Sequence, residues 1–133
     1  MADKPTGMHK GLTSYGDQKF SQYLRDAFLR GMGYTKEATD KPIIGITNTF
    51  SNYNACHRTV PDLINAVKRG VMMAGGLPME FPVISLHEAF SYPSSMLLRN
   101  QMAMDVEEMI KAQAMDAVVL IGGCDKTVPA LLM

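Results

Sequence analysis

The stretch AVVLIGGCDKT, residues 117–127, indicates the fold class of this chain. Its first five residues form a short, uninterrupted apolar run, which is typical of a strand buried on both faces. The two glycines that follow indicate a tight loop over residues 122–126, and Pro129 suits the first turn of a helix beyond that loop. The stretch therefore predicts one strand–loop–helix unit.

Two apolar runs upstream repeat this order. Residues 42–47 and 79–86 predict strands, and Pro82 indicates that the second strand lies at a sheet edge or contains a bulge. Apolar residues at helical spacing predict helices over residues 17–32, 59–74 and 94–114. Strands that alternate with helices predict an α/β fold in three layers, a parallel sheet flanked by helices with right-handed crossovers.

The composition fits a folded chain and argues against several classes of protein. Hydrophobic residues make up 47% of the 133 residues and charged residues 20%, which is enough apolar material for a packed core. The formal net charge is zero, which argues against a nucleic-acid partner, because binding a polyanion requires an excess of cations. No apolar run approaches the roughly 18 residues of a membrane span. With no visible secretory signal and only two cysteines, we expect a cytoplasmic protein.

The chain is expected to have two parts. Residues 1–16 are polar and contain three glycines, so we expect a loosely ordered N-terminal arm. Residues 17–133 show no internal boundary and are expected to form one α/β unit. The apolar run TVPALLM at residues 127–133 has the pattern of a helix that is cut off. We therefore expect the chain to be the N-terminal portion of a larger domain.

Three loops follow the predicted strands, at residues 48–57, 87–93 and 122–126. In an open parallel sheet the carboxyl ends of all strands lie along one edge, and ligands bind there. These loops contain both cysteines, two of the three histidines, and Glu88, Asp125 and Lys126. The sequence thus predicts that thiol and charged side chains from distant segments converge on one rim.

The two cysteines, Cys56 and Cys124, leave several interpretations open. They are too far apart for a CxxC motif. A thiolate is a soft ligand suited to zinc, copper or an iron–sulfur cluster. Each cysteine could equally be a small buried apolar residue. Cys124 could also act as a nucleophile if His57 or His87 lay within reach as a base.

Glu88 and Asp125 carry the hard oxygen ligands that Mg²⁺ or Mn²⁺ prefers, although each could instead be a helix cap or a solvated charge. The pair Lys126-Thr127 suggests a phosphate-binding loop. That motif requires a glycine directly before the lysine, and Asp125 occupies this position. An anion could still bind at the start of the helix that follows.

Four motifs together resemble the dihydroxy-acid dehydratase and phosphogluconate dehydratase family. They are SNYNACH at 51–57, HEAF at 87–90, RNQMAMD at 99–105 and GGCDKT at 122–127. The likeness runs from about Gly31 to Met133, and because family members are several times longer, it implies the front of their N-terminal domain. Within the family, the chain looks most like the sugar-acid (aldonate) dehydratases, followed by the enzyme of branched-chain amino-acid synthesis.

The resemblance implies a role for each candidate residue. Cys56 and Cys124 match two of the three cysteines that hold an iron–sulfur cluster, a 2Fe–2S cluster in preference to 4Fe–4S. Glu88 and Asp125 match carboxylate ligands of Mg²⁺. Lys126 matches a catalytic lysine that is carbamylated in some members, so that its carbamate oxygen also binds Mg²⁺. The third cysteine, another glutamate ligand and the serine base lie further along the chain in the family.

The implied function is that of an iron–sulfur- and Mg²⁺-dependent hydro-lyase, which converts a 2,3-dihydroxy sugar acid to a 2-keto-3-deoxy acid. The resemblance implies a homo-oligomer at full length, and we expect residues 1–133 alone to be inactive. One alternative is the dihydroxy-acid dehydratase of branched-chain amino-acid synthesis. Another is a non-catalytic α/β module that binds a small anion or a nucleotide. Zinc-dependent hydrolysis through Cys56, His57 and Cys124 is weaker, because His57 directly follows Cys56.

Overall fold

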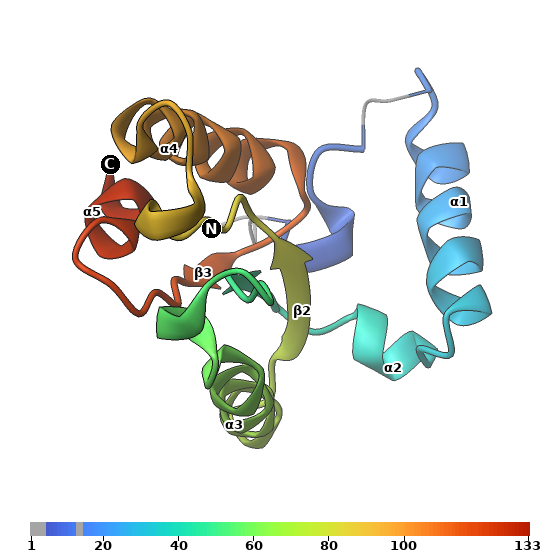
Figure 1. Ribbon diagram of the computed structural model, residues 1–133. Helices are drawn as coiled ribbons and strands as arrows, with labels where there is room; N and C mark the ends of the chain where they lie inside the picture. The colour runs from blue at the N-terminus through green and yellow to red at the C-terminus, as the bar shows by residue number, and fades with distance from the viewer. Residues whose placement is uncertain (1–4, 13–14) are drawn as a thin grey trace.

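The computed structural model describes residues 5–12 and 15–133 of the chain, which fold into an α/β unit (Figure 1). The elements, in which η denotes a 3₁₀ helix, are η1 (Gly7–His9), α1 (Gln18–Gly31), α2 (Lys36–Thr39), β1 (Ile43–Asn48), η2 (Ala55–His57), α3 (Val60–Met73), β2 (Leu77–Pro82), η3 (Glu88–Phe90), α4 (Ser95–Ala112), β3 (Ala117–Val119) and α5 (Thr127–Leu132). No helix in this described part is both long and apolar enough to cross a membrane.

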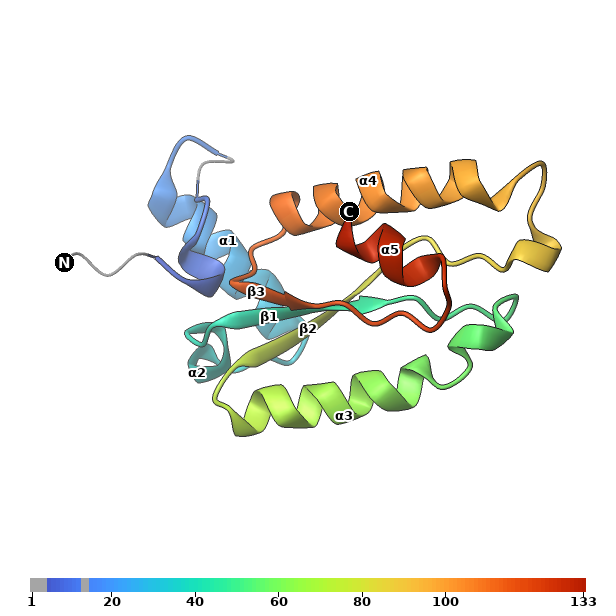
Figure 2. The ribbon, with the colours of Figure 1, turned by 90° about the vertical axis from the view of Figure 1, so that its left-hand side faces the viewer.

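The sheet is parallel throughout, as the sequence predicts. Its strand order is β2-β1-β3, so that β1 lies in the centre and pairs with both neighbours. Helices α4 and α5 cover one face of the sheet and α3 covers the other (Figure 2). The three-layer α/β prediction is confirmed.

The core is divided by the sheet into separate apolar clusters. On one face, Ile46 of β1 packs with Val60 and Ile64 of α3. On the other, Met102 of α4 packs with Leu131 of α5. Burial on both faces explains why the strands have continuous apolar runs rather than an alternating pattern.

The three long helices lie close to their predicted positions because their end signals are local. The Asp17 carboxylate accepts hydrogen bonds from the backbone N–H groups of Lys19 and Phe20 at the start of α1. Ser94 caps α4 in the same way, through the N–H of Met96. The short helix α2 was not predicted, since four residues are too few for a periodic pattern to appear.

The predicted range of β1 is one residue off at each end, and side-chain hydrogen bonds lie where β2 and β3 end earlier than predicted. The strand predicted at 79–86 is β2, which starts at Leu77 and ends at Pro82; beyond it, the N–H of Ile84 donates to Asp105 of α4. The third strand was predicted to reach Ile121, but β3 ends at Val119. The N–H of Ile121 donates to the hydroxyl of Thr47 instead of to a backbone carbonyl. Among the described strands, β2 lies at an edge, as Pro82 indicated.

The described part of the N-terminal arm is docked on the domain, which corrects the expectation of loose order for residues 5–12. Met8 is buried in an apolar cluster with Ile43. The N–H groups of Gly7 and Ile43 both donate to the Asp116 carboxylate, which also forms an ion pair with Lys10. Residues 1–4 and 13–14 of the predicted arm lie outside the described residues.

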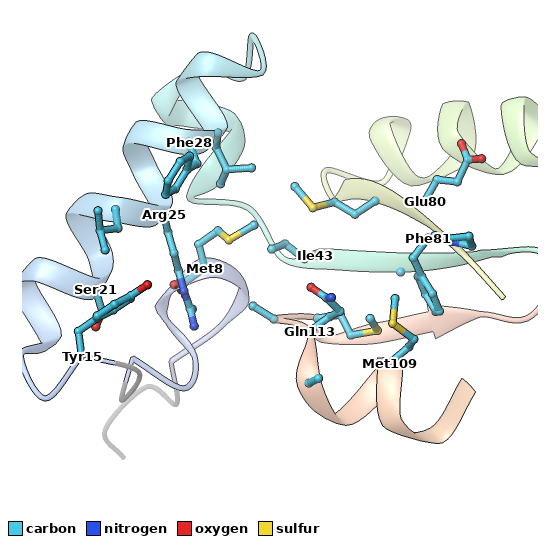
Figure 3. Close-up of a pocket in the computed structure, with 18 residues that line it drawn as sticks. Met8, Tyr15, Ser21, Arg25, Phe28, Ile43, Glu80, Phe81, Met109 and Gln113 are labelled. Atoms are coloured by element: carbon cyan, nitrogen blue, oxygen red, sulfur yellow. Dashed lines mark hydrogen bonds between the residues drawn. The ribbon is translucent and has the colours of Figure 1, made fainter. Parts of the chain in front are cut away.

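An apolar cleft of about 550 Å³ lies between α1, the sheet and the C-terminal half of α4. Phe28 of α1 lies toward one end of this cleft and Phe81 of β2 toward the other (Figure 3). Methionines from several elements line it, but its described lining includes neither cysteine nor histidine. The cleft therefore lacks the thiol and metal-binding groups that the sequence singles out.

Candidate functional site

The turns that follow β1, β2 and β3 gather at one end of the sheet (Figure 2). The turn after β1 contains η2 with Cys56, and the turn after β2 contains η3 with Glu88. The turn after β3 carries Cys124, Asp125 and Lys126. The predicted convergence on one rim is confirmed, because parallel strands present their carboxyl ends to the same side.

The two cysteine-bearing turns touch directly at Gly123. A Cβ atom added to Gly123 would lie 2.5 Å from the carbonyl oxygen of Cys56 and 2.9 Å from the ring of His57. A residue with a side chain would force these turns apart. The glycine before Cys124 is therefore required by the close approach of the turn that carries Cys56.

The sulfur of Cys124 lies among hydrogen-bond donors. Its Sγ is 2.9 Å from the hydroxyl oxygen of Thr127 and 3.7 Å from Nη2 of Arg99. Burial raises the pKa of the Cys124 thiol, but the hydrogen bonds from Thr127, the backbone N–H of Lys126 and the charge of Arg99 together bring this pKa below its usual value. These surroundings favour the thiolate, which is the form that binds a soft metal.

Cys56 has different surroundings. It is exposed, whereas the adjacent His57 is completely buried. The two neighbouring side chains thus lie in opposite environments, one open to solvent and one inside the fold. The rim carries one thiol that is held by donors and one that is open to solvent.

Three charged side chains form an ion-pair cluster at the same rim. The Lys126 ammonium lies 2.7 Å from a carboxylate oxygen of Glu88 and 3.3 Å from one of Asp125. The hydrogen bond to Glu88, followed by that to Asp125, raises the pKa of Lys126. The two carboxylates that the sequence singles out therefore converge on one positive centre.

His57 is held by its ring nitrogen Nδ1, which lies 2.6 Å from the carbonyl oxygen of Thr49. Burial lowers the pKa of His57, the Thr49 bond opposes this, and the charge of Arg99 lowers the pKa further. Because a carbonyl oxygen only accepts, a hydrogen bond between Nδ1 and Thr49 requires the proton on Nδ1. The other nitrogen, Nε2, is buried against the rim without a hydrogen-bond partner in the described structure. His87 is also hydrogen-bonded within its loop, since its Nδ1 accepts from the N–H of Ala89.

Sequence reasoning assigned no role to two buried residues at this rim. Thr127 is completely buried and contacts the sulfur of Cys124. Arg99 of α4 is 6% exposed and reaches Thr127, Cys124 and the carbonyl of Leu86. A signal for Arg99 does exist, because Arg99, Met102 and Val106 share one helix face, and the two apolar members predict that this face is buried.

The donor types at the rim fit the groups that the resemblance implies, although the described residues do not complete either site. Two thiols on touching turns suit an iron–sulfur cluster, and two carboxylates that converge on one positive centre suit a divalent cation. Within residues 5–12 and 15–133, no three side chains of His, Cys, Asp or Glu are grouped to hold a metal ion. Further ligands would have to come from other residues.

The fold and the rim define an α/β domain with thiol and carboxylate donors at the carboxyl ends of its strands. Residues 41–133 match the family described as dihydroxy-acid/6-phosphogluconate dehydratase N-terminal. The chain belongs to this family, so the resemblance noted from its motifs is confirmed.

Three curated relatives illustrate the range of the family. The chain is 45% identical to L-arabonate dehydratase of Azospirillum brasilense over 90% of its own length and 21% of that protein. It is 48% identical to 6-deoxy-6-sulfo-D-gluconate dehydratase of Pseudomonas putida, over 74% of the chain and 17% of the relative. It is 38% identical to dihydroxy-acid dehydratase of Clostridium kluyveri, over 80% of the chain and 20% of the relative. The chain thus spans about a fifth of the length of these relatives.

Proposed function

We propose that this chain supplies the N-terminal segment of a hydro-lyase that uses an iron–sulfur cluster and Mg²⁺ to remove water from a sugar acid. The observation that carries the proposal is the rim where the sulfur of Cys124, in contact with Thr127 and Arg99, adjoins carboxylates that converge on Lys126. Two relatives named as dehydratases of sugar acids are 45% and 48% identical to the chain, against 38% for one named dihydroxy-acid dehydratase. A sugar acid is therefore the preferred substrate class.

The chain's own residues would supply part of the ligand set of both groups. Cys56 and Cys124 would supply two thiolates to the cluster, and Glu88 and Asp125 two carboxylates to Mg²⁺. The bound groups would supply Lewis-acid chemistry to a reaction with a weakly acidic C2 proton and a poor leaving group, the C3 hydroxide. Gly123 allows the two thiol-bearing turns to meet, and Thr127 holds the sulfur of Cys124 in place.

Lys126 has a defined part in this proposal. As an ammonium ion it neutralises Glu88 and Asp125, and a positive charge at this point would repel Mg²⁺. If the ammonium gave up one proton to solvent, the amine could add CO₂ through a new N–C bond and release a second proton, which would replace the positive charge with an anionic carbamate oxygen. The two carboxylates and a carbamate would then form a hard, anionic ligand set of the kind that Mg²⁺ prefers.

The proposal is tested on the full-length protein that carries this chain, purified without oxygen. Iron, acid-labile sulfide, magnesium and zinc are measured, and keto-acid formation is followed with L-arabonate, other aldonates and a branched-chain 2,3-dihydroxy acid. Iron with sulfide and turnover of an aldonate support the proposal. Zinc alone, or no metal and no turnover, contradicts it, and turnover of only the branched-chain acid moves the assignment to the dihydroxy-acid enzyme.

Two variants separate the proposed sites. Cys124→Ser should lose iron, sulfide and activity, because an alcohol oxygen replaces thiolate poorly on iron. Asp125→Asn should keep the cluster but raise the Mg²⁺ concentration needed for half-maximal activity. Glu108→Gln, on an exposed face of α4, serves as the carboxylate control. Full cluster absorbance in Cys124→Ser, or an unchanged Mg²⁺ titration in Asp125→Asn, would remove that residue from its site.

A further inference from the structure

Arg99 carries a buried charge that no carboxylate balances in the described part of the chain. The residue is 6% exposed, and none of the ion pairs among residues 5–12 and 15–133 includes it. Its Nε is buried and has no hydrogen-bond partner there either. A buried cation without an anionic partner is costly, so its retention calls for a negative group nearby.

The contacts of Arg99 connect three segments that are distant in the sequence. From α4, Nη1 donates to the hydroxyl of Thr127 at 2.8 Å and Nη2 donates to the carbonyl of Leu86 at 2.8 Å. Leu86 lies two residues before Glu88 in the turn after β2. One guanidinium therefore ties the turn that carries Glu88 to the turn that carries Cys124.

The sulfur of Cys124 lies within reach of the same guanidinium. Nη2 lies 3.7 Å from this sulfur, and the hydroxyl oxygen of Thr127, which accepts from Nη1, lies 2.9 Å from it. The planar guanidinium presents several donors in fixed directions, so it can serve a carbonyl and a sulfur at the same time. Lysine could keep the charge but not both of these directions.

We propose that Arg99 is a positioning residue for Cys124. Its guanidinium holds the cysteine turn against the turn that carries Glu88 and places a positive charge beside the sulfur of Cys124, where it would compensate the negative charge of a cluster bound through that sulfur. The part that concerns the cluster rests on the proposed function. The connection between the two turns rests on the contacts of Arg99 alone.

The test uses the full-length protein with Arg99→Met, Arg99→Lys and the control Arg69→Met, which removes an exposed arginine from α3. The first readout is amide hydrogen exchange of residues 86–90 and 124–128 without a cluster. Arg99→Met should speed exchange in both segments about tenfold, since hydrogen bonds of a charged group are lost. Arg69→Met should leave both segments unchanged.

The second readout is the cluster itself. In competition with a chelator, Arg99→Met should bind iron about 10- to 100-fold more weakly than wild type. A loss of this size is expected when a residue that hydrogen-bonds to a metal ligand is removed. Its reduction potential should move to more negative values, because a hydrogen bond and a positive charge near the sulfur are lost. Arg99→Lys should recover part of the potential by keeping the charge, but not the slow exchange at residues 86–90.

The outcomes distinguish this inference from the proposed function. If wild-type protein binds no iron and sulfide, the proposed function fails, and the exchange data still decide whether Arg99 connects the two turns. If wild-type protein holds a cluster while Arg99→Met matches Arg69→Met in exchange and in potential, the inference about Arg99 is overturned. Faster exchange with an unchanged potential also overturns it, because Arg99 would then be only a structural contact. Should Arg99→Met fail to fold, Arg99→Lys carries the same comparisons.

Discussion

Replacing Thr127 with valine tests whether a single hydroxyl organises the thiol side of the rim. Thr127 is completely buried, and its Oγ1 lies 2.9 Å from the sulfur of Cys124 and 2.8 Å from Nη1 of Arg99. Valine has nearly the same shape but cannot accept a hydrogen bond from a guanidinium. The substitution therefore removes polar contacts from a buried site with little change in volume.

The expected loss of stability follows from these two contacts. A hydrogen bond to a charged group contributes about 1.5–3 kcal/mol, and one between neutral groups about 1 kcal/mol. Because the contact with sulfur is the weaker of the two, we expect Thr127→Val to lower the free energy of unfolding by about 2–4 kcal/mol. Thr127→Ser keeps the hydroxyl and removes one methyl group, which corresponds to about 0.8 kcal/mol.

Urea denaturation followed by far-UV circular dichroism measures both variants, and the chain contains no tryptophan whose fluorescence could serve instead. The comparison uses the denaturation midpoint at an unchanged slope with urea concentration. Thr127→Val should be clearly less stable than Thr127→Ser. If serine proves the more damaging replacement, packing of the threonine methyl against Gly122 dominates, and the reasoning about the hydroxyl is refuted.

Two further predictions concern the arm and the rim. Burial raises the pKa of Asp116, but hydrogen bonds from Lys10 and from two backbone N–H groups bring this pKa below its usual value. As the pH falls, the unfolded chain therefore takes up a proton at Asp116 before the folded chain does. The carboxylate thus stabilises the fold above about pH 4, and this contribution is lost as the pH falls through the folded-state pKa. Asp116→Asn should therefore have a lower free energy of unfolding than wild type at pH 7, and the difference should shrink below pH 4. A difference that stays constant from pH 7 to pH 3 in urea titrations would contradict this. Gly123→Ala would place a Cβ 2.5 Å from the carbonyl oxygen of Cys56, so we expect a loss of about 1–3 kcal/mol in unfolding free energy and a lower iron content in the full-length protein, with the open Gly31→Ala as control. Equal stability and iron content in both glycine variants would show that the two turns do not need this close approach.

The parts of the fold that sequence reasoning predicted are those with local signals. The apolar run at 117–121 and the glycines after it lie next to each other in the chain, so their pattern predicts a strand and a turn without knowledge of partners. The long helices carry their own caps at Asp17 and Ser94. The convergence of the rim residues then follows from parallel topology alone.

The parts that were missed depend on partners distant in the sequence. Arg99 bonds to Thr127, 28 residues away, and Asp116 accepts from Gly7, 109 residues away. Neither pairing produces a periodic pattern in the sequence. The arm was expected to be loose because its composition is polar, yet one buried methionine, Met8, and one carboxylate dock it. The sequence likewise predicts which residue types reach the rim but not which of them form ion pairs.

The order of residues in the turn after β3 bears on how the proposed chemistry would be arranged. Cys124 is partly buried among donors, whereas the adjacent Asp125 has a side chain that is 81% exposed and turns toward Lys126. One step along the backbone thus separates a soft, partly buried thiol from a hard, exposed carboxylate. Loss of water from a 2,3-dihydroxy acid needs help at two neighbouring carbons, at C2 for the proton and at C3 for the hydroxide. Adjacent residues with opposite surroundings suit such a substrate better than two ligands of one kind would, since each type of donor selects its own metal. Swapping the two donors, as Cys124→Asp with Asp125→Cys, would keep the composition of the rim but reverse this arrangement.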